Sequence, residues 1–315
     1  MKKIKECEIC GNKEFLFLFE QNDKNLNLPQ KFSLNKCLNC GLIFLNPQPS
    51  YKNLEKHYDP KKYYSLQKII DKNGSKKVRI KLFLYNLYFN PKKNDFFLKM
   101  VFSPLKFFIR GTKIEEGKKL LDVGCGSGQF LYEMKGFGMN VWGVEPGNFN
   151  EIDSKKYELN IKKGDLRNAK YCSKNFNIIT MNHVLEHINN PKETIKEIHR
   201  ILKKDGTFIV AVPNSNSLAY HLFGKNWHQL DVPRHLFDFS NKNLKKLLED
   251  SGFKIKKTRY NSRSGQFVVS LYFLLEIKKR RGIVNKILNL IFLPLVWIFN
   301  FLRTGDQIEF WCEKK

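Results

Sequence analysis

The sequence predicts an α/β protein with a doubly wound parallel sheet, a small cysteine-rich module before the sheet and a helical hydrophobic insertion before its last strand. Three observations carry this prediction. Apolar strand-like segments alternate with helix-like segments from 119 to 260, a glycine ladder follows the first of them, and two Cys-x-x-Cys pairs lie near the start. We divide the 315 residues into four parts, namely a ribbon (1–45), a helical lid (46–116), a core (117–260) and an insertion with the last strand (261–315).

The first module contains two cysteine pairs separated by 26 residues, and each pair is followed by a glycine that permits a tight turn. Four thiolates can hold one zinc ion tetrahedrally, and with no open coordination position the ion would be structural. Redox-active pairs are the alternative, but they need a βαβ setting that is missing here. We expect this zinc ribbon to close on itself before the connector NPQPS. Its predicted ligands are Cys7, Cys10, Cys37 and Cys40.

The core begins with KLLDVGCGSGQF, which predicts a strand that turns onto a helix N-terminus. Glycines at 124, 126 and 128 let a ligand approach the backbone closely. Glu145 follows Asp122 by 23 residues, at the end of the apolar stretch NVWGVEP, where an acid can meet the hydroxyls of a nucleotide ribose. Folds that bind NAD share these features, so the pattern by itself does not choose the ligand.

The segments that follow narrow the choice. They are GDL (164–166), FNIITM, NHVLEHINNP, a helix with Pro191 in its first turn, the turn KKDG, the strand TFIVAVPN, and LDVPRHLFDFS before a helix that ends at SGF (251–253). From about 118 to 260 this order resembles the class I S-adenosylmethionine-dependent methyltransferases, in particular the branch that includes quinone and sugar O-methyltransferases. An NAD-binding domain or a degenerate fold without a ligand is the alternative, and the later motifs do not belong to dehydrogenases.

The resemblance implies S-adenosylmethionine as cofactor and assigns parts of it to residues. The methionine end would meet Asp122 and the glycine loop, the ribose Glu145, and the adenine Asp165 and Leu166, while Asn182 and His183 would lie beside the methyl group. An aromatic residue of HYDPKKYYS would cover the cofactor, although ordinary helix packing explains that residue equally well. The cofactor-binding candidates are Asp122, Gly124, Cys125, Gly126, Gly128, Glu145, Asp165, Leu166, Asn182, His183 and Tyr64.

An oxygen acceptor must lose its proton during methyl transfer, which requires a base. His235 in PRHLF is the first candidate, because it adjoins Arg234 and Asp231 in a loop expected at the carboxyl edge of the sheet. His187 in LEHI is the second catalytic candidate, and its alternative role is capping or packing before the helix at Pro191.

The insertion lies between predicted strands at 253–260 and 307–314 and carries two apolar stretches that flank KKRRG. We expect these stretches to lie on the inner face of a membrane, with the basic run at the headgroups, because a single crossing would separate the last strand from its sheet. A helical hairpin packed on the domain, or a homo-oligomer interface, is the alternative. The start MKKIKECEICG leads to cysteines instead of an apolar leader, so we expect a cytoplasmic, peripheral membrane protein.

The formal net charge of +26 bears on possible partners. Most of the basic residues are lysines, in a sequence rich in Asn, Ile and Phe, so composition explains much of the charge and nucleic acid is the less favoured partner. We therefore expect O-methylation of a glycan, a lipid-linked sugar or another small-molecule acceptor. The alternatives are an RNA methyltransferase that uses the zinc ribbon and the basic surface, and an inactive scaffold that only binds the cofactor.

Overall fold

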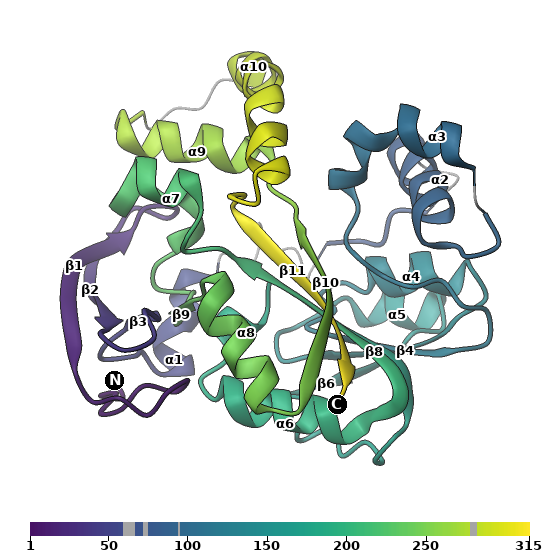
Figure 1. The fold of residues 1–315 in the computed structure, drawn as a ribbon, viewed down its shortest axis with the longest axis horizontal. Coiled ribbons are helices and arrows are strands. Elements are labelled where there is room, and N and C mark those ends of the chain that lie inside the picture. The colour runs from purple at the N-terminus through teal and green to yellow at the C-terminus, as the bar shows by residue number, and fades with distance from the viewer. Residues whose placement is uncertain (59–66, 72–74, 94, 278–281) are drawn as a thin grey trace.

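The computed structural model describes the whole chain except residues 59–66, 72–74, 94 and 278–281 (Figure 1). Its centre is a seven-stranded sheet with the order β10-β11-β8-β7-β4-β5-β6. Neighbours from β8 to β6 are parallel, and β11 runs antiparallel to both β8 and β10. The predicted doubly wound α/β fold is therefore confirmed. The strands are β4 Lys119–Val123, β5 Asn140–Glu145, β6 Asn160–Lys163, β7 Phe176–Asn182, β8 Leu202–Pro213, β10 Phe253–Tyr260 and β11 Gln307–Lys314.

One local expectation is wrong. The segment KKDG was expected as a turn, but β8 already begins at Leu202 and runs through it. The pairing of β8 with β7 is irregular between Phe176 and Ile178. A side chain at Gly206 would lie 2.7 Å from the Cδ1 atom of Leu202, so the glycine gives the strand room to bend at this irregularity.

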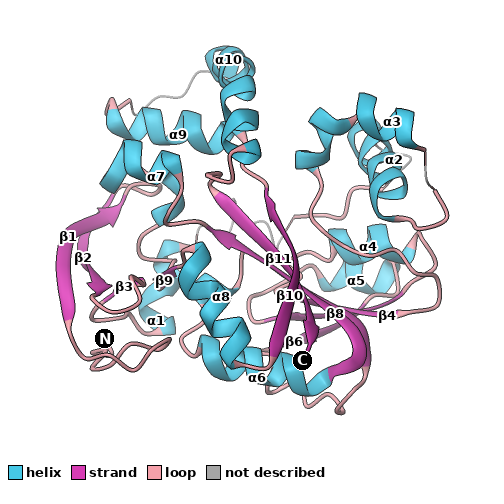
Figure 2. Cartoon of the chain, in the orientation of Figure 1, coloured by secondary structure: helices cyan, strands magenta, loops and turns pink. Residues whose placement is uncertain are grey.

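Helices cover both faces of the sheet, as Figure 2 shows. They are α4 Gln129–Lys135, α5 Glu151–Lys156, α6 Pro191–Ile201 and α8 Asn241–Asp250. α6 begins with its proline in the first turn, as expected, and buries Ile195, Ile198 and Ile201, which share one helical face. α8 begins at a capping box between Ser240 and Asn243.

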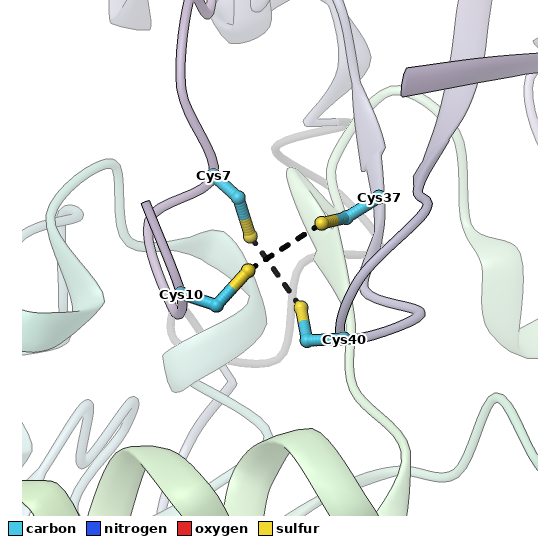
Figure 3. Close-up of side chains that lie close together, drawn as sticks. All are labelled: Cys7, Cys10, Cys37 and Cys40. Atoms are coloured by element: carbon cyan, nitrogen blue, oxygen red, sulfur yellow. Dashed lines mark hydrogen bonds between the residues drawn. The ribbon is translucent and has the colours of Figure 1, made fainter. Parts of the chain in front are cut away.

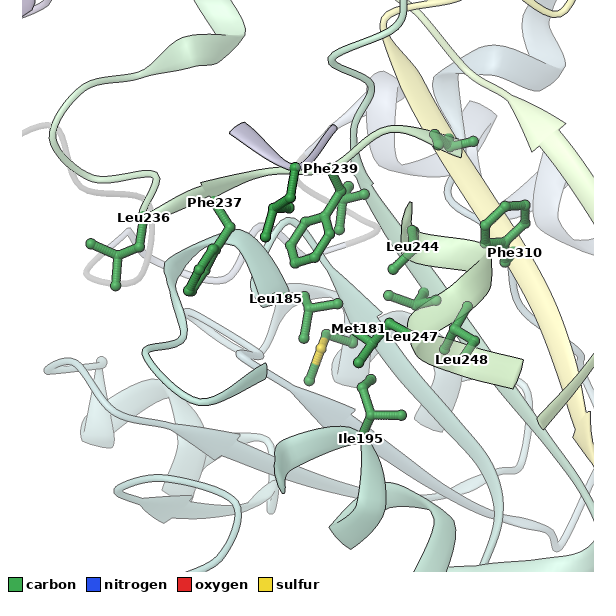
Figure 4. Packing of buried hydrophobic residues seen from close by; sticks show 14 of the residues in the cluster. Met181, Leu185, Ile195, Leu236, Phe237, Phe239, Leu244, Leu247, Leu248 and Phe310 are labelled. Carbon is green, nitrogen blue, oxygen red and sulfur yellow. The ribbon is translucent and has the colours of Figure 1, made fainter. Parts of the chain in front are cut away.

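The main core lies between these helices and the sheet. Figure 4 shows side chains from β7, α6, α8, β11 and the segment 236–239 meeting there. Because residues 236–239 also border the N-terminal module, one continuous apolar cluster joins that module to the core. The labelled members are Met181, Leu185, Ile195, Leu236, Phe237, Phe239, Leu244, Leu247, Leu248 and Phe310.

The N-terminal module does not close on itself, which corrects the expectation. Its sheet has the order β1-β2-β3-β9, and its last strand, β9 (Phe237–Asp238), comes from the core segment PRHLFDF. β9 pairs antiparallel with β3 at Ile43↔Asp238 and Phe44↔Phe237. The module and the core therefore share a sheet. Its other strands are β1 Phe15–Asp23, β2 Leu28–Cys37 and β3 Ile43–Leu45.

Short helices lie between the module and the core, and α2 and α3 form a separate lobe in Figure 1. α2 packs Tyr85 against Phe130 of α4, with ring centroids 6.1 Å apart. The side chain of Lys81 reaches Glu133 of α4 at 2.8 Å. The elements are α1 Tyr51–Leu54, η1 Glu55–His57, α2 Lys76–Phe89, α3 Phe96–Val101 and η3 Ser103–Phe108. The predicted cofactor residue Tyr64 lies outside the described residues.

The insertion forms two helices, α9 (Ser264–Leu274) and α10 (Gly282–Phe301), between β10 and β11. α10 is long and apolar enough to cross a membrane by length and composition, and 11% of its most apolar window is buried. Phe267 of α9 packs against Phe292 and Phe299 of α10 at 4.8 and 6.1 Å. α9 also contacts α7 (Leu218–Phe223), η5 (Gly224–Asn226) and η6 (His228–Leu230). The expected basic run 278–281 lies outside the described residues.

Candidate functional site

The glycine loop follows β4 and leads into α4. Gly124, Gly126 and Gly128 have φ angles of +69°, +56° and +82°, a region that favours glycine. A Cβ atom at Gly124 would lie 2.3 Å from Cγ2 of Val184, so this glycine is also required where the β4 loop meets the loop after β7. The glycines therefore serve packing as well as access of a ligand to the backbone.

Asp122 at the end of β4 is buried and already has two partners. Arg110 donates to its Oδ1 atom, and the Thr180 hydroxyl donates to the same atom at 2.7 Å. Burial raises the pKa of Asp122, and the Arg110 guanidinium opposes that rise. The guanidinium lies 3.6 Å from the centroid of the Phe130 ring and lines the cavity described below. Arg110, held by Asp122, is therefore the charged group that meets a ligand at this point.

Glu145 at the end of β5 organises the glycine loop. Its two carboxylate oxygens accept hydrogen bonds from the backbone amides of Gly126 at 2.8 Å and Gly147 at 2.9 Å. Burial raises the pKa of Glu145, and these two amides oppose the rise. A ribose would have to use the remaining lone pairs of this carboxylate.

The other predicted cofactor residues fall into two groups. Cys125, Asn182 and His183 line the same cavity as Gly124. Asp122, Gly126, Gly128 and Glu145 are not part of its described lining, and neither are Asp165 and Leu166. Asp165 is exposed and accepts from the backbone of Asn168 at 2.8 Å, while Leu166 is buried in the core. Burial raises the pKa of the Cys125 thiol, which suits a small packing residue better than a nucleophile.

The cavity has a volume of about 1460 Å³. Pockets for one small ligand typically occupy roughly 300–1,000 Å³, so this cavity has room for a cofactor and an acceptor. One end is formed by the glycine loop, Arg110 and Phe130. The other end is rich in side-chain amides and lysines from the tip of the β1–β2 hairpin and from the loop after α7, namely Gln21, Asn22, Lys24, Asn25, Asn27, Lys225, Asn226 and Gln229.

Both predicted catalytic histidines line the cavity, and their rings make an edge-to-face contact with centroids 4.7 Å apart. Nδ1 of His235 lies 2.7 Å from the Gln229 carbonyl, and Nδ1 of His187 lies 2.9 Å from the Arg234 carbonyl. Because a carbonyl can only accept, both Nδ1 atoms carry hydrogen and each neutral ring keeps its lone pair on Nε2. The pKa of His235 is lowered to about 4, mainly by burial and to a smaller extent by the neighbouring His187.

Glu186 lies close to the two rings and is fully buried. Neither of its oxygens has a hydrogen-bond partner among the described residues, although Nδ1 of His183 lies 3.4 Å away and Nε2 of His235 3.9 Å away. Burial opposes ionisation of Glu186, but the surrounding histidines outweigh it and lower the pKa. The ligand atoms of Glu186, His187 and His235 lie within 4.8 Å of one another, so this cluster could take up a proton or a divalent cation.

An ion-pair network ties the N-terminal module to the histidine loop. Arg234 donates to Asp23 at the end of β1 at 2.8 Å and to Asp231 of its own loop. His57 lies 2.8 Å from Asp23 through Nδ1, and the ring is buried in the wall of the cavity. Burial raises the pKa of Asp231, but the hydrogen bond from Arg234 outweighs it and holds that pKa well below its usual range. The network positions the loop that carries His235.

The four cysteines of the N-terminal module converge, as Figure 3 shows. The Sγ atoms of Cys7 and Cys40 lie 3.5 Å apart, as do those of Cys10 and Cys37. Four sulfurs about 2.3 Å from a central zinc lie roughly 3.8 Å from one another, so this arrangement fits a tetrahedral ion. The hydrogen bond between Cys7 and Cys40 lowers the pKa of Cys7 and raises that of Cys40, so this pair favours one thiolate and one thiol in the absence of a metal.

Sequence reasoning missed two parts of the site. Arg110 precedes β4 in a segment without a motif, and only its position before an acid-terminated strand could have drawn attention to it. The hairpin tip from Glu20 to Asn27 reaches the cavity through long-range packing that the ribbon pattern does not encode.

Comparison with known proteins supports one family. A family model described as a methyltransferase domain matches residues 100–258, about half of the chain. A ubiquinone biosynthesis O-methyltransferase from Pelagibacter ubique is 30% identical over 185 residues, which cover 50% of this chain and 75% of that protein. One from Glaesserella parasuis is 29% identical over 117 residues, so the chain spans about half the length of that relative.

Solved structures share the fold. The [4+2]-cyclase SpnF aligns with a TM-score of 0.50 at 15% identity and covers 85% of this chain and 97% of its own. A possible histamine N-methyltransferase from Thermotoga maritima aligns with a TM-score of 0.45 at 20% identity, covering 70% and 92% of the two chains. At 15% identity the likeness to SpnF concerns the fold alone, and the chemistry must be argued from the site.

Proposed function

We propose that this chain, which belongs to the methyltransferase domain family, is an S-adenosylmethionine-dependent methyltransferase. Its acceptor would be a hydroxyl group of a glycan, a lipid-linked sugar or a related small molecule. The observation that carries this proposal is the division of one cavity into two chemically different ends. One end has the glycine loop and a cationic group, and the other is lined by amides, lysines and aromatic rings.

The first end suits the cofactor. The Arg110 guanidinium can hold the carboxylate of the methionine part, and Asp122 keeps that guanidinium in place. Glu145 holds the loop amides and can accept the ribose hydroxyls on its remaining lone pairs. Asn182 and His183 line the same cavity. When bound, the cofactor supplies an electrophilic methyl group whose leaving thioether is neutral.

The second end suits a hydroxylated acceptor. Side-chain amides donate and accept hydrogen bonds at once, which matches sugar hydroxyls, and Tyr272 and Phe273 offer aromatic surface. Lys24 lies inside this end, where burial lowers its pKa, and an anionic group on the acceptor would be a favourable neighbour for it. An RNA methyltransferase is less favoured, because the tip of the N-terminal module forms a cavity wall here.

His235 is the proposed base. Its ring is neutral near pH 7, so its Nε2 lone pair can accept the proton of the acceptor hydroxyl, but a pKa of about 4 lies below the range that best suits a general base. Glu186 and Asp231 each place a carboxylate oxygen 3.9 Å from that Nε2 and would stabilise the imidazolium that forms. The rest of the rate enhancement would come from alignment of the two reactants.

We also propose that Cys7, Cys10, Cys37 and Cys40 hold a structural zinc ion. This ion would fix the base of the β1–β2 hairpin, whose tip forms the acceptor end of the cavity. The zinc would therefore support acceptor binding without taking part in the chemistry.

The test is a transfer assay with radiolabelled S-adenosylmethionine against a panel of hydroxylated glycans and lipid-linked sugars. His235→Ala should lower turnover ~10²–10⁴-fold while cofactor affinity, measured by calorimetry, stays within about twofold. His187→Ala is the matched comparison, and a larger loss there would transfer the role of base to His187. The same assay with a chelator separates the two uses of the histidine cluster, because a bound cation would make turnover chelator-sensitive. Failure to bind S-adenosylmethionine would contradict the proposal.

A further inference from the structure

α10 presents an apolar surface to the outside along most of its length. Leu290 and Ile291 are 72% and 61% exposed, and Phe301 at the C-terminal end is 86% exposed. The inner face is occupied, because Phe292 and Phe299 pack on α9. Soluble proteins rarely expose continuous apolar patches of this kind, which mark surfaces that bind a partner or a membrane.

A second apolar surface lies on α3. Phe96 and Phe97 are 80% and 65% exposed, and Met100 and Val101 beside them are more than half exposed. Figure 1 shows α3 and α10 at the same end of the molecule, although they belong to different parts of the chain. Two separate apolar helices at one end match a broad flat partner better than a single peptide or a small ligand.

The segments that carry these helices are almost free of acids. Residues 261–305 contain one acid, Glu276, and seven lysines and arginines, of which the four at 278–281 lie outside the described residues. Residues 75–114 contain ten basic residues and one acid, Asp95. Lys286 of α10 and Arg303 just after it are exposed in the described structure. Apolar side chains accompanied by positive charge are complementary to an anionic lipid surface.

We propose that α10 and α3 together dock this end of the protein onto the surface of an anionic bilayer, without crossing it. A second copy of the chain is disfavoured as the occupant, because it would bring two strongly positive surfaces together. The attachments of α10 argue against a crossing: the Asn300 side chain accepts from the backbone amide of Ser262 at 2.8 Å, and β11 re-enters the sheet from Gln307. α9, on which α10 packs, is in turn held to η6 by a hydrogen bond from the His228 amide to the Ser270 hydroxyl at 2.9 Å.

α9, on which α10 packs, ends at the acceptor end of the cavity. Leu274 and Ile277, at the end of α9, both line the cavity and are 47% and 41% exposed. An acceptor that carries a lipid chain could leave the chain in the bilayer and place its polar head among the amides of the cavity. This part of the inference rests on the proposed function and narrows the acceptor to a lipid-linked one.

The test is flotation of the full-length protein with vesicles of phosphatidylcholine, alone or mixed with phosphatidylglycerol. The wild type should float with the mixed vesicles at low salt and much less with phosphatidylcholine alone or in high salt. Leu290→Ser with Ile291→Ser, and separately Phe96→Ser with Phe97→Ser, should each lower the partition coefficient at least about tenfold, since each removes two exposed apolar side chains. Ile152→Ser is the matched control, because Ile152 is 79% exposed on α5, away from this end.

Wild-type protein that stays unbound under every condition would overturn the inference, as would equal losses in the control and the paired variants. A stable dimer in solution that the α10 variant dissociates would also overturn it and would assign this face to a second copy. Calorimetry with S-adenosylmethionine on the same samples separates the two proposals. A protein that binds the cofactor but no vesicles refutes only the membrane contact, and one that binds vesicles but no cofactor supports this contact and refutes the proposed function.

Discussion

Replacing Gly124 by alanine tests whether the glycine loop is limited by its contact with the loop after β7. Two costs apply. The left-handed φ of +69° costs an alanine about 1–2 kcal/mol, and the new methyl group would lie 2.3 Å from Val184, an overpacking that costs about 1–3 kcal/mol. We therefore expect Gly124→Ala to lower the free energy of unfolding by about 2–5 kcal/mol.

Gly117→Ala is the matched control. Gly117 has a φ of +73°, but nothing lies within 4 Å of the position that its Cβ atom would occupy. It should lose only the conformational part, about 1–2 kcal/mol, and the entropy change of the unfolded chain is the same in both variants. Urea titrations followed by tryptophan fluorescence measure both losses.

A function readout accompanies the stability measurement. Val184 directly follows His183, which lines the cavity, so displacing Val184 should also weaken S-adenosylmethionine binding in Gly124→Ala. Binding to Gly117→Ala should be unchanged. Equal destabilisation of the two variants, within about 0.5 kcal/mol, would refute the argument that close approach of the two loops is what requires Gly124.

Three further predictions follow from the contacts. Arg110→Ala should weaken S-adenosylmethionine binding about tenfold or more, since a charge-assisted hydrogen bond contributes ~1.5–3 kcal/mol, and calorimetry showing unchanged affinity would contradict that role. Purified protein should contain close to one zinc per chain, and the Cys37→Ser variant should lose both the metal and acceptor binding. Full zinc content in that variant would show that the four cysteines are not one site. His235 has its folded pKa lowered to about 4, below the usual ~6.5, so its contribution to stability is present above pH 6.5 and is lost as the pH falls towards 4, by roughly 3 kcal/mol. Burial raises the pKa of Asp306 to about 6, so the contribution of Asp306 to stability changes with pH in the opposite direction. The free energy of unfolding of the wild type and of His235→Gln should therefore be compared across this pH range. Parallel plots of that free energy against pH would refute the effect of His235.

The order of the core elements could be predicted from the sequence because it depends on local patterns. The strands at 253–260 and 307–314 have the bounds that their apolar periodicity indicated, and α6 begins at the expected Pro191. The glycine loop also lies where its spacing placed it. Each of these features depends on residues close together in the chain.

The missing parts depend on contacts between distant residues. A two-residue strand such as Phe237–Asp238 has no periodicity of its own, and only its pairing with β3 defines it. Arg110 is held in the site by its hydrogen bond to the buried Asp122. The hairpin is held at the cavity by the hydrogen bond from Arg234 to Asp23. The expected adenine contacts at Asp165 and Leu166 came from the resemblance alone, and the described cavity wall does not include them.

The pairing of β3 with β9 also constrains how the chain folds during synthesis. The partner of Asp23 in the buried ion pair is Arg234, 211 positions later, and β9 begins shortly after it at Phe237. The first three strands therefore emerge from the ribosome long before their fourth strand exists, with an unpaired edge at β3. Zinc bound at the cysteines would hold the nascent hairpin in shape during this interval, so metal shortage should appear first as aggregation of newly made chains, before any loss from protein that is already folded.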